Sequence, residues 1–335
     1  MRSAPKNYIL QKLFLILICF IICIIYLTLP EKTPTLHLEE TPVRAVRGVI
    51  VTLIRSSSRS IFFTINMIHS ITQFYPNNGT FLYPLIIFHE ENLTPVMRQQ
   101  ILSCVLKSNG TINISFALVN FSTSVSPNTG SRSEKSMGYR LMCRFWTYDV
   151  FYHPAIVQGK YEYLMRMDDD SYFSDRIKKD PFLYMDSRKL DYIYRSTYKE
   201  SAYPLYSILK PILKKKYVHI TCVYNNFFMI RLKWYYESPR VQNFINELIK
   251  DNLILREYIG DGCIHGAMLR VDRRHVREEH VRDIPYGHNY HIMPPGYHQW
   301  KFKEVNDFHE VMHKSCEQLT ILKGTQGKVT SIKMS

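Results

Sequence analysis

The sequence predicts an α/β fold with a mixed, mostly parallel central sheet. Short apolar runs alternate with longer segments of helical periodicity over residues 48–173. Their order is strand, helix, strand, helix, strand, helix, strand, which requires crossover connections and therefore mostly parallel pairing. The chain has 335 residues and 46% hydrophobic content, so it is long and apolar enough to bury a substantial core.

Each predicted element rests on a local pattern of apolar residues and turn signals. Residues 48–54 are a largely apolar run, and a polar turn separates them from a helix whose apolar residues recur on one face. Thr94 and Pro95 give the next helix a hydroxyl cap and a proline in its first turn. The other predicted strands cover residues 83–88, 112–119, 161–167, 191–197 and 222–232, and the other predicted helices cover residues 95–106, 139–152, 239–252 and 261–269.

The strand at the centre of the chain ends in three consecutive acids, Asp168, Asp169 and Asp170. Crowded carboxylates raise each other's pKa, and a bound divalent cation removes that cost. Hard oxygen ligands of this kind suit Mg²⁺ or Mn²⁺. Because alternate residues of an extended segment face opposite sides, we expect Asp169 to point away from the other two or to solvent. A solvated acidic turn is the alternative interpretation.

A polar turn from Arg55 to Ser58 follows the first predicted strand. Ligands of open α/β sheets bind beyond the carboxyl ends of the strands, and both this turn and the three acids are expected at that edge. We therefore expect a phosphate-bearing donor there, with Arg55 as a candidate to bind it.

The N-terminal segment predicts a membrane anchor. Residues 13–29 form an almost unbroken apolar run without a charge, just long enough to span a bilayer. The basic residues before this run keep the N-terminus in the cytoplasm. A cleaved signal peptide is the alternative, but the run is long and lacks a small-residue cleavage site. We expect a cytoplasmic stub (1–12), a transmembrane signal anchor (13–29), a stem (30–47), a lumenal domain (48–300) whose residues 280–300 form an irregular lid, and a C-terminal tail (301–335).

Sequons, cysteines and charge are consistent with a lumenal body. Five of the seven cysteines fall in it, and an odd number leaves at least one thiol unpaired or paired with another chain. The formal charge is +14, and nucleic acid is the usual partner of so basic a chain. A lumenal location argues against nucleic acid and favours membrane surfaces and nucleotide phosphates. The asparagines of the Asn-x-Ser/Thr sequons, which are expected at the surface, are Asn78, Asn92, Asn109, Asn113 and Asn120.

Six short motifs lie in order between residues 44 and 295. They are Tyr139-Arg140-Leu141-Met142-Cys143-Arg144-Phe145, Arg166-Met167-Asp168-Asp169-Asp170, Asp180-Pro181-Phe182, Tyr224-Asn225-Asn226-Phe227, Gly260-Asp261-Gly262-Cys263-Ile264-His265 and Asp283-Ile284-Pro285-Tyr286-Gly287-His288. Their order and spacing resemble those of the family 15 glycosyltransferases, the fungal-type Golgi α-1,2-mannosyltransferases that use GDP-mannose.

The resemblance implies a nucleotide-diphosphosugar-transferase (GT-A type) fold, a Mn²⁺ cofactor, GDP-mannose as donor, and a glycoprotein or glycolipid glycan as acceptor in the Golgi. Its metal-ligand positions fall on Asp168, Asp170 and His288, with nearby histidines as alternatives for the third ligand. Core positions are the alternatives for Tyr139 and His265. The candidate catalytic residues are Tyr139, Asn226, Phe228 and Asp261, and the candidate donor-binding residues are Arg55, Arg140, Arg144, Asp168 and His265.

One position departs from the family pattern. The family has Asn-Phe-Glu where this chain has Asn226-Phe227-Phe228, so a carboxylate suited to stabilise the transition state is missing. Loss of one charge-stabilising group costs on the order of a hundred- to a thousandfold in rate. Transfer then proceeds by front-face departure of the diphosphate, or Asp261 substitutes, or the protein is an inactive relative that binds glycan or nucleotide sugar. A transferase with another donor, such as UDP-galactose or UDP-glucose, also fits.

Overall fold

The computed structural model describes residues 45–76, 83–106, 112–131, 135–288, 320–325 and 328–333. The chain divides into two units, Met1–Ala45 and Val46–Ser335, and nearly all of the described residues belong to the second. The predicted stub, the anchor over residues 13–29 and most of the stem lie outside the described residues. Within the described ranges, no helix is both long and apolar enough to cross a membrane.

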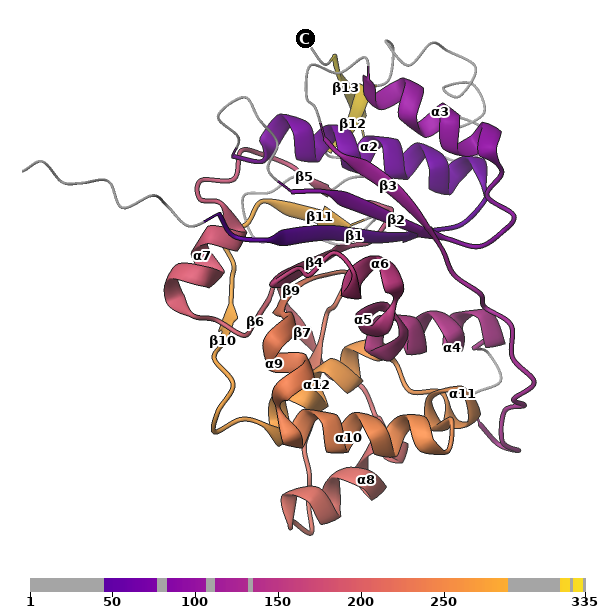
Figure 1. Ribbon diagram of the computed structural model, residues 1–335, viewed down its shortest axis with the longest axis vertical. Coiled ribbons are helices and arrows are strands. Elements are labelled where there is room, and N and C mark those ends of the chain that lie inside the picture. The colour runs from indigo at the N-terminus through magenta and orange to yellow at the C-terminus, as the bar shows by residue number, and fades with distance from the viewer. Residues whose placement is uncertain are drawn as a thin grey trace, which may run out of the picture. The chain divides into compact units, whose positions relative to one another are not determined.

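Seven strands of the described part form one sheet in the order β10-β6-β9-β4-β1-β2-β3 (Figure 1). Neighbours are parallel except around β9, which runs antiparallel to both β4 and β6. The predicted mixed, mostly parallel sheet is therefore confirmed. The strands are β1 (Gly48–Ile54), β2 (Leu85–His89), β3 (Ile114–Leu118), β4 (Tyr163–Met167), β6 (Tyr192–Tyr194), β9 (Phe227–Arg231) and β10 (Glu278–His280).

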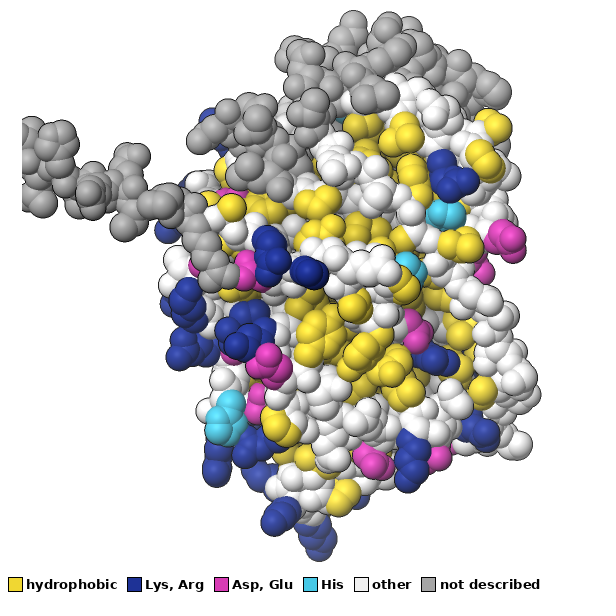
Figure 2. All heavy atoms as spheres, in the orientation of Figure 1, with side chains coloured by type: hydrophobic (Ala, Val, Ile, Leu, Met, Phe, Trp, Pro, Cys, Tyr) yellow, Lys and Arg dark blue, Asp and Glu magenta, His cyan; other side chains and the backbone are white. Residues whose placement is uncertain are grey.

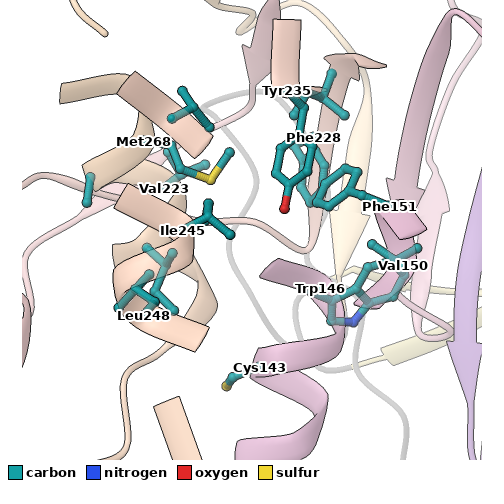
Figure 3. Packing of buried hydrophobic residues seen from close by; sticks show 14 of the residues in the cluster. Cys143, Trp146, Val150, Phe151, Val223, Phe228, Tyr235, Ile245, Leu248 and Met268 are labelled. Atoms are coloured by element: carbon teal, nitrogen blue, oxygen red, sulfur yellow. The ribbon is translucent and has the colours of Figure 1, made fainter. Parts of the chain in front are cut away.

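The central strands are apolar on both faces because helices cover both sides of the sheet. Side chains alternate between two buried clusters, so that Val49 and Val51 of β1 join one cluster and Ile50 and Ile54 join the other. Figure 1 shows α2 (Ser58–Phe74) and α3 (Pro95–Leu106) on one side of the sheet. Helices such as α10 (Pro239–Lys250) and α12 (Asp261–Val271) lie on the opposite side, and Figure 3 shows side chains of the first cluster. α7 (Pro181–Arg188) instead packs Phe182 and Met185 into the same cluster as α2.

The helices predicted from clear caps or periodicity occur where expected, and several short ones were missed. The helix predicted over residues 139–152 is present but changes its winding in the middle, where residues Phe145–Asp149 form a π-helical segment, η1. The remaining helices are α4 (Met137–Arg144), α5 (Val150–Tyr152), α6 (Pro154–Val157), α7 (Pro181–Arg188), α8 (Tyr203–Leu213), α9 (Leu232–Glu237), α10 (Pro239–Lys250), α11 (Leu253–Glu257) and α12 (Asp261–Val271).

Two predicted strands are each split in the structure. Residues 191–197 yield β6 and the short β7 (Thr197–Tyr198), and residues 222–232 yield β8 (Cys222–Val223) and β9. β7 and β8 pair with each other outside the main sheet, which draws this part of the chain away from β6 and β9. Each predicted strand therefore contributes to two sheets. The apolar pattern does not show where the strand changes its pairing partner.

Two further pairings correct the predictions for the C-terminal third. β5 (Ser171–Phe173) pairs antiparallel with β11 (Tyr286–His288), so part of the predicted irregular lid is a strand. The expected tail contains an antiparallel hairpin of β12 (Thr320–Thr325) and β13 (Lys328–Lys333). β-Branched residues are frequent in both hairpin strands and favour extended backbone.

Three of the predicted sequon asparagines, Asn92, Asn113 and Asn120, are exposed, as expected. Asn78 and Asn109 lie outside the described residues. On the face drawn in Figure 2, Lys and Arg side chains lie mainly toward the left and lower edges, and hydrophobic side chains lie between them.

A disulfide between Cys222 and Cys263 joins β8 to the first turn of α12. Cys104 is also disulfide-bonded, and Cys143 is a buried free thiol, so the prediction of an unpaired cysteine is confirmed. The helix lies so close to the strand that a Cβ on Gly266 would be 2.0 Å from the Thr221 carbonyl oxygen. Only glycine permits this contact.

Replacement of Gly266 by alanine should therefore destabilise the fold. A methyl group forced against backbone costs about 1–3 kcal/mol, which outweighs the gain of about 1 kcal/mol that alanine brings to a helix. Gly138→Ala in α4 is the matched control, because a Cβ there meets nothing within 4 Å. We expect denaturant unfolding to show a loss of stability for the first variant and no loss for the second. Equal stability of the two variants would contradict the packing described here.

Candidate functional site

The three predicted metal ligands lie together at the carboxyl end of β4. His288 Nε2 lies 2.8 Å from Asp170 Oδ1 and 3.6 Å from Asp168 Oδ2. One ligand atom from each residue lies within 4.8 Å of the other two. The β5–β11 register produces this meeting, because it pairs His288 with Ser171, the residue after Asp170. Two carboxylate oxygens and one imidazole nitrogen are a donor set that fits Mn²⁺.

Asn226, the residue immediately before β9, contacts two of the three candidate ligands. Its Nδ2 donates to Asp168 Oδ2 at 2.7 Å and lies 2.9 Å from His288 Nε2. Its carbonyl oxygen accepts from the backbone N–H of Asp168 at 3.1 Å. The residue was predicted as catalytic, and the structure places it where it orients two of the three candidate ligands.

The two carboxylates set the charge of the histidine. Burial alone lowers the pKa of His288, but the hydrogen bonds and charges of Asp168 and Asp170 outweigh it and raise the pKa to about 9. For Asp168 the directions are reversed. Burial alone raises the pKa of this carboxyl, but the charge of Arg166 and the hydrogen bond from His288 outweigh burial and lower the pKa to about 2. The two carboxylates thus favour a positive charge on the group beside them.

A single buried arginine joins this cluster to the start of α12. Arg166 Nε and Nη2 each lie 2.8 Å from Asp168 Oδ1, and Nη1 lies 2.7 Å from Asp261 Oδ2. The guanidinium lies 4.1 Å from the ring centroid of Trp146 and its side chain is 3% exposed. Arg166 therefore spans two carboxylates that are 93 positions apart in sequence (261 minus 168).

The middle acid turns to the opposite side, as predicted, but it does not face open solvent. Asp169 accepts a hydrogen bond from Ser60 Oγ in the first turn of α2. The backbone N–H of Arg55 donates to the same Ser60 Oγ at 3.0 Å. Burial and then the charge of Asp170 raise the pKa of Asp169 to about 7. The Arg55 turn and the acidic loop are thus bonded to each other at one sheet edge, and the Arg55 side chain is exposed there.

The structure corrects two of the predicted donor-binding residues. His265 is fully buried, with Nδ1 at 2.8 Å from the Tyr192 hydroxyl and Nε2 at 3.1 Å from the Trp146 carbonyl oxygen. Arg140 is also fully buried, and it donates to backbone oxygens that include that of Leu255 near the end of α11. A helix end leaves carbonyl oxygens without partners, and a buried guanidinium satisfies them. Neither side chain is exposed to a donor.

Arg144 is partly exposed and pairs with Asp149 of the adjoining π-helical segment at 3.4 Å, and its role in donor binding stays a prediction.

Phe228 and Tyr139 are the remaining predicted residues. Phe228 is fully buried, stacks on Tyr192 with ring centroids 5.5 Å apart, and lies among the core side chains of Figure 3. Tyr139 is half-buried, and its ring lies 5.9 Å from that of Tyr258. Burial, followed by the charges of Cys143 and Asp261, raises the pKa of Tyr139 to about 12.

Sequence reasoning missed the roles of Arg166 and Ser60. A charged residue inside an apolar strand signals a buried partner, so Arg166 carried a usable signal. Ser60 carried none, because its bond to Asp169 depends on how α2 lies beside the acidic loop.

No family model and no curated protein matches the chain. Solved structures with a similar fold include core-mannan synthase A from Aspergillus fumigatus in its Mn/GDP form, with a TM-score of 0.57 and 16% identity over 72% of this chain and 74% of that one. The mannosyltransferase Ktr4p from S. cerevisiae in complex with GDP has a TM-score of 0.57 and 17% identity over 72% and 71% of the two chains. The predicted GT-A type fold and the resemblance to fungal family 15 enzymes are thus confirmed at the level of the fold.

Removal of one acidic ligand should weaken divalent cation binding. Asp170→Asn takes a negative charge away from the cluster while preserving its shape. Loss of a residue that merely supports a ligand costs about 10- to 100-fold in metal affinity, so loss of a ligand should cost at least about 100-fold. Calorimetric titration with Mn²⁺ measures the effect, and Asp175→Asn, an exposed acid nearby, is the control. Equal affinities for Mn²⁺ in both variants would exclude Asp170 as a ligand.

Burial of His265 should make the fold sensitive to acid. Burial lowers the pKa of this histidine from 6.5 to about 4, so the folded protein resists a proton that the unfolded chain accepts. Its contribution to stability is therefore lost as the pH falls from about 6.5 toward 4, by on the order of 3 kcal/mol in total. Unfolding free energies measured across this range should fall less steeply for His265→Gln than for the wild type. Identical slopes would show that the histidine is not held neutral.

Proposed function

We propose that the protein is a Mn²⁺-dependent, retaining α-1,2-mannosyltransferase that transfers mannose from GDP-mannose to a mannose hydroxyl of a glycoprotein or glycolipid glycan. The observation that carries the proposal is the cluster of Asp168, Asp170 and His288 at the carboxyl end of the central strand of a GT-A type sheet. The similar structures are described as bound to GDP, and one of them as bound to Mn as well, which supports the same ligands here.

The cluster residues fit the cation that this function requires. Asp168, Asp170 and His288 would hold it, and Asn226 would keep two of them in place. A bound Mn²⁺ supplies a Lewis acid that neutralises the diphosphate. Arg166 keeps Asp168 ionised at neutral pH, because it lowers the pKa of that carboxyl. Arg55 adds an exposed positive charge on the same edge, where a phosphate would lie.

The transfer replaces one bond to the anomeric carbon with another. The bond between that carbon and the diphosphate oxygen breaks, and its electron pair leaves with GDP. The acceptor oxygen forms the new bond on the same face, and its proton passes to the departing diphosphate. Phe228 is apolar and fully buried, so a covalent intermediate at this position is excluded. Front-face departure is the proposed route, and a carboxylate role for Asp261 is the alternative.

A protein that binds GDP-mannose without turnover is the second candidate. It is favoured by Phe228, which stands where the family has a carboxylate and packs against Tyr192 and His265, with the Arg166 guanidinium 6.0 Å from its ring centroid. A transferase with a UDP-sugar donor would use the same metal chemistry. A comparison of donors distinguishes it from a transferase that uses GDP-mannose.

We further propose a single-pass type II protein of the Golgi membrane with a lumenal catalytic domain. The apolar run over residues 13–29 supports the anchor, and the exposed sequon asparagines Asn92, Asn113 and Asn120 support a lumenal body.

A donor panel tests the proposed reaction. Purified protein is incubated with GDP-mannose, UDP-galactose or UDP-glucose and an α-mannoside, with and without Mn²⁺, and the released nucleotide is measured. We expect GDP release from GDP-mannose that requires both Mn²⁺ and acceptor, and that falls at least about 100-fold in Asp170→Asn. Asp175→Asn should be unaffected. Binding without release would favour the second candidate, and release from a UDP-sugar would identify another donor.

A further inference from the structure

A hollow of about 180 Å³ opens beside the N-terminus of α12, and the metal cluster is not part of its lining. Three segments form its wall: the turn at residues 130–131, the segment 200–204 that leads into α8, and residues 257–260 between α11 and α12. The charged and aromatic lining residues are Glu200, Tyr203, Glu257 and Tyr258, and Ser131 and Ser201 add two hydroxyl groups.

The hollow is connected to the candidate site through the start of α12. Gly260 lines it and precedes Asp261, the carboxylate that Arg166 links to Asp168. A Cβ on Gly260 would lie 3.8 Å from Glu200 Oε2 and 3.5 Å from the Tyr258 hydroxyl, so both groups closely surround this glycine. A molecule in the hollow would thus lie one residue from Asp261.

The charges of the lining exclude the nucleotide donor. Among the described residues of the lining, the two charged ones are both acidic, Glu200 and Glu257. The ammonium of Lys135 lies 5.5 Å over the Tyr258 ring but does not line the hollow. Two carboxylates repel a diphosphate, and they would also repel a sugar that carries a phosphate. An uncharged ligand that donates hydrogen bonds avoids this cost, because ionised carboxylates are acceptors only.

The aromatic groups narrow the class of ligand further. Tyr203 is 73% exposed although it is a large ring at the rim of a hollow. A flat, exposed ring with a polar edge suits a ligand that is apolar on one face and rich in hydroxyls around its perimeter. Pyranose sugars have this character, since their C–H groups lie along the ring faces and their hydroxyls point outward.

We propose that this hollow binds the acceptor as an uncharged, hydroxyl-rich saccharide, whose hydroxyls donate to Glu200 and Glu257 and whose ring packs against Tyr203. The proposal rests on the transferase function proposed above, and it adds a substrate class: neutral glycans are accepted and phosphorylated glycans are rejected.

Single substitutions at the rim test the binding site. Tyr203→Ala and Glu257→Gln should each raise the KM for an α-mannoside acceptor at least about tenfold, in line with the loss of 1.4 kcal/mol of binding free energy. The KM for GDP-mannose and the Mn²⁺ requirement should not change. Tyr217→Ala is the matched control, because Tyr217 is 74% exposed and does not line the hollow. Unchanged acceptor KM values in both rim variants would overturn the proposal.

A pair of acceptors tests the charge preference. An α-1,2-mannobiose and the same disaccharide with a 6-phosphate are compared by kcat/KM, and the neutral compound should be preferred at least about tenfold because the carboxylates repel phosphate. The double variant Glu200→Gln, Glu257→Gln should narrow this preference. Equal use of both acceptors by the wild type would refute the assigned class.

A measurement of disaccharide binding tests the saccharide site independently of the transfer reaction. Saturation-transfer NMR with α-1,2-mannobiose should show binding to the wild type and to Tyr217→Ala, and weaker binding to Tyr203→Ala. If no donor is turned over but this pattern holds, the transferase function fails and the saccharide site stands. If transfer occurs and Tyr203→Ala binds the disaccharide as tightly as the wild type, the saccharide site fails and the transferase stands.

Discussion

The contact of Arg166 with two carboxylates is the interaction on which the site depends. A buried guanidinium loses its hydration at a cost of several kcal/mol, and only well-placed anions offset that loss. Asp168 and Asp261 supply them, with the Trp146 ring beneath, and their charges outweigh burial and keep the pKa of Arg166 high. The strand fixes the arrangement, because Arg166 and Asp168 are alternate residues at the end of β4 and β9 pairs directly with Arg166.

Three distant parts of the chain meet at the acidic loop. Ser60 from α2 bonds to Asp169, Asn226 precedes β9 and bonds to Asp168, and His288 arrives through the pairing of β11 with β5. Because each contact bridges more than fifty residues, none of them forms from local structure alone. The cluster is assembled only when the sheet and its covering helices are complete, so any variant that loosens the sheet also disperses the ligands.

The sequence predicted those features that local patterns encode. β1, α3 and the start of α12 lie where apolar runs, caps and turn residues put them, and the acids at the end of β4 follow from strand topology. His265 and Arg140 were misassigned because polarity in a motif does not reveal burial, and both satisfy buried partners instead. His288 was placed through family resemblance alone, since nothing local signals that β11 pairs with β5.

The π-helical segment Phe145–Asp149 leaves one backbone carbonyl oxygen, that of Trp146, for a partner outside the helix. There the Val150 N–H bonds to the Phe145 carbonyl oxygen, five residues back, rather than to that of Trp146. The Trp146 oxygen accepts from His265 Nε2 instead, which fixes the tautomer so that Nδ1 accepts from the Tyr192 hydroxyl. The extra residue in the turn and the imidazole depend on each other. Without the imidazole the buried Trp146 carbonyl oxygen would lose this donor, so the widened turn and His265 stabilise each other.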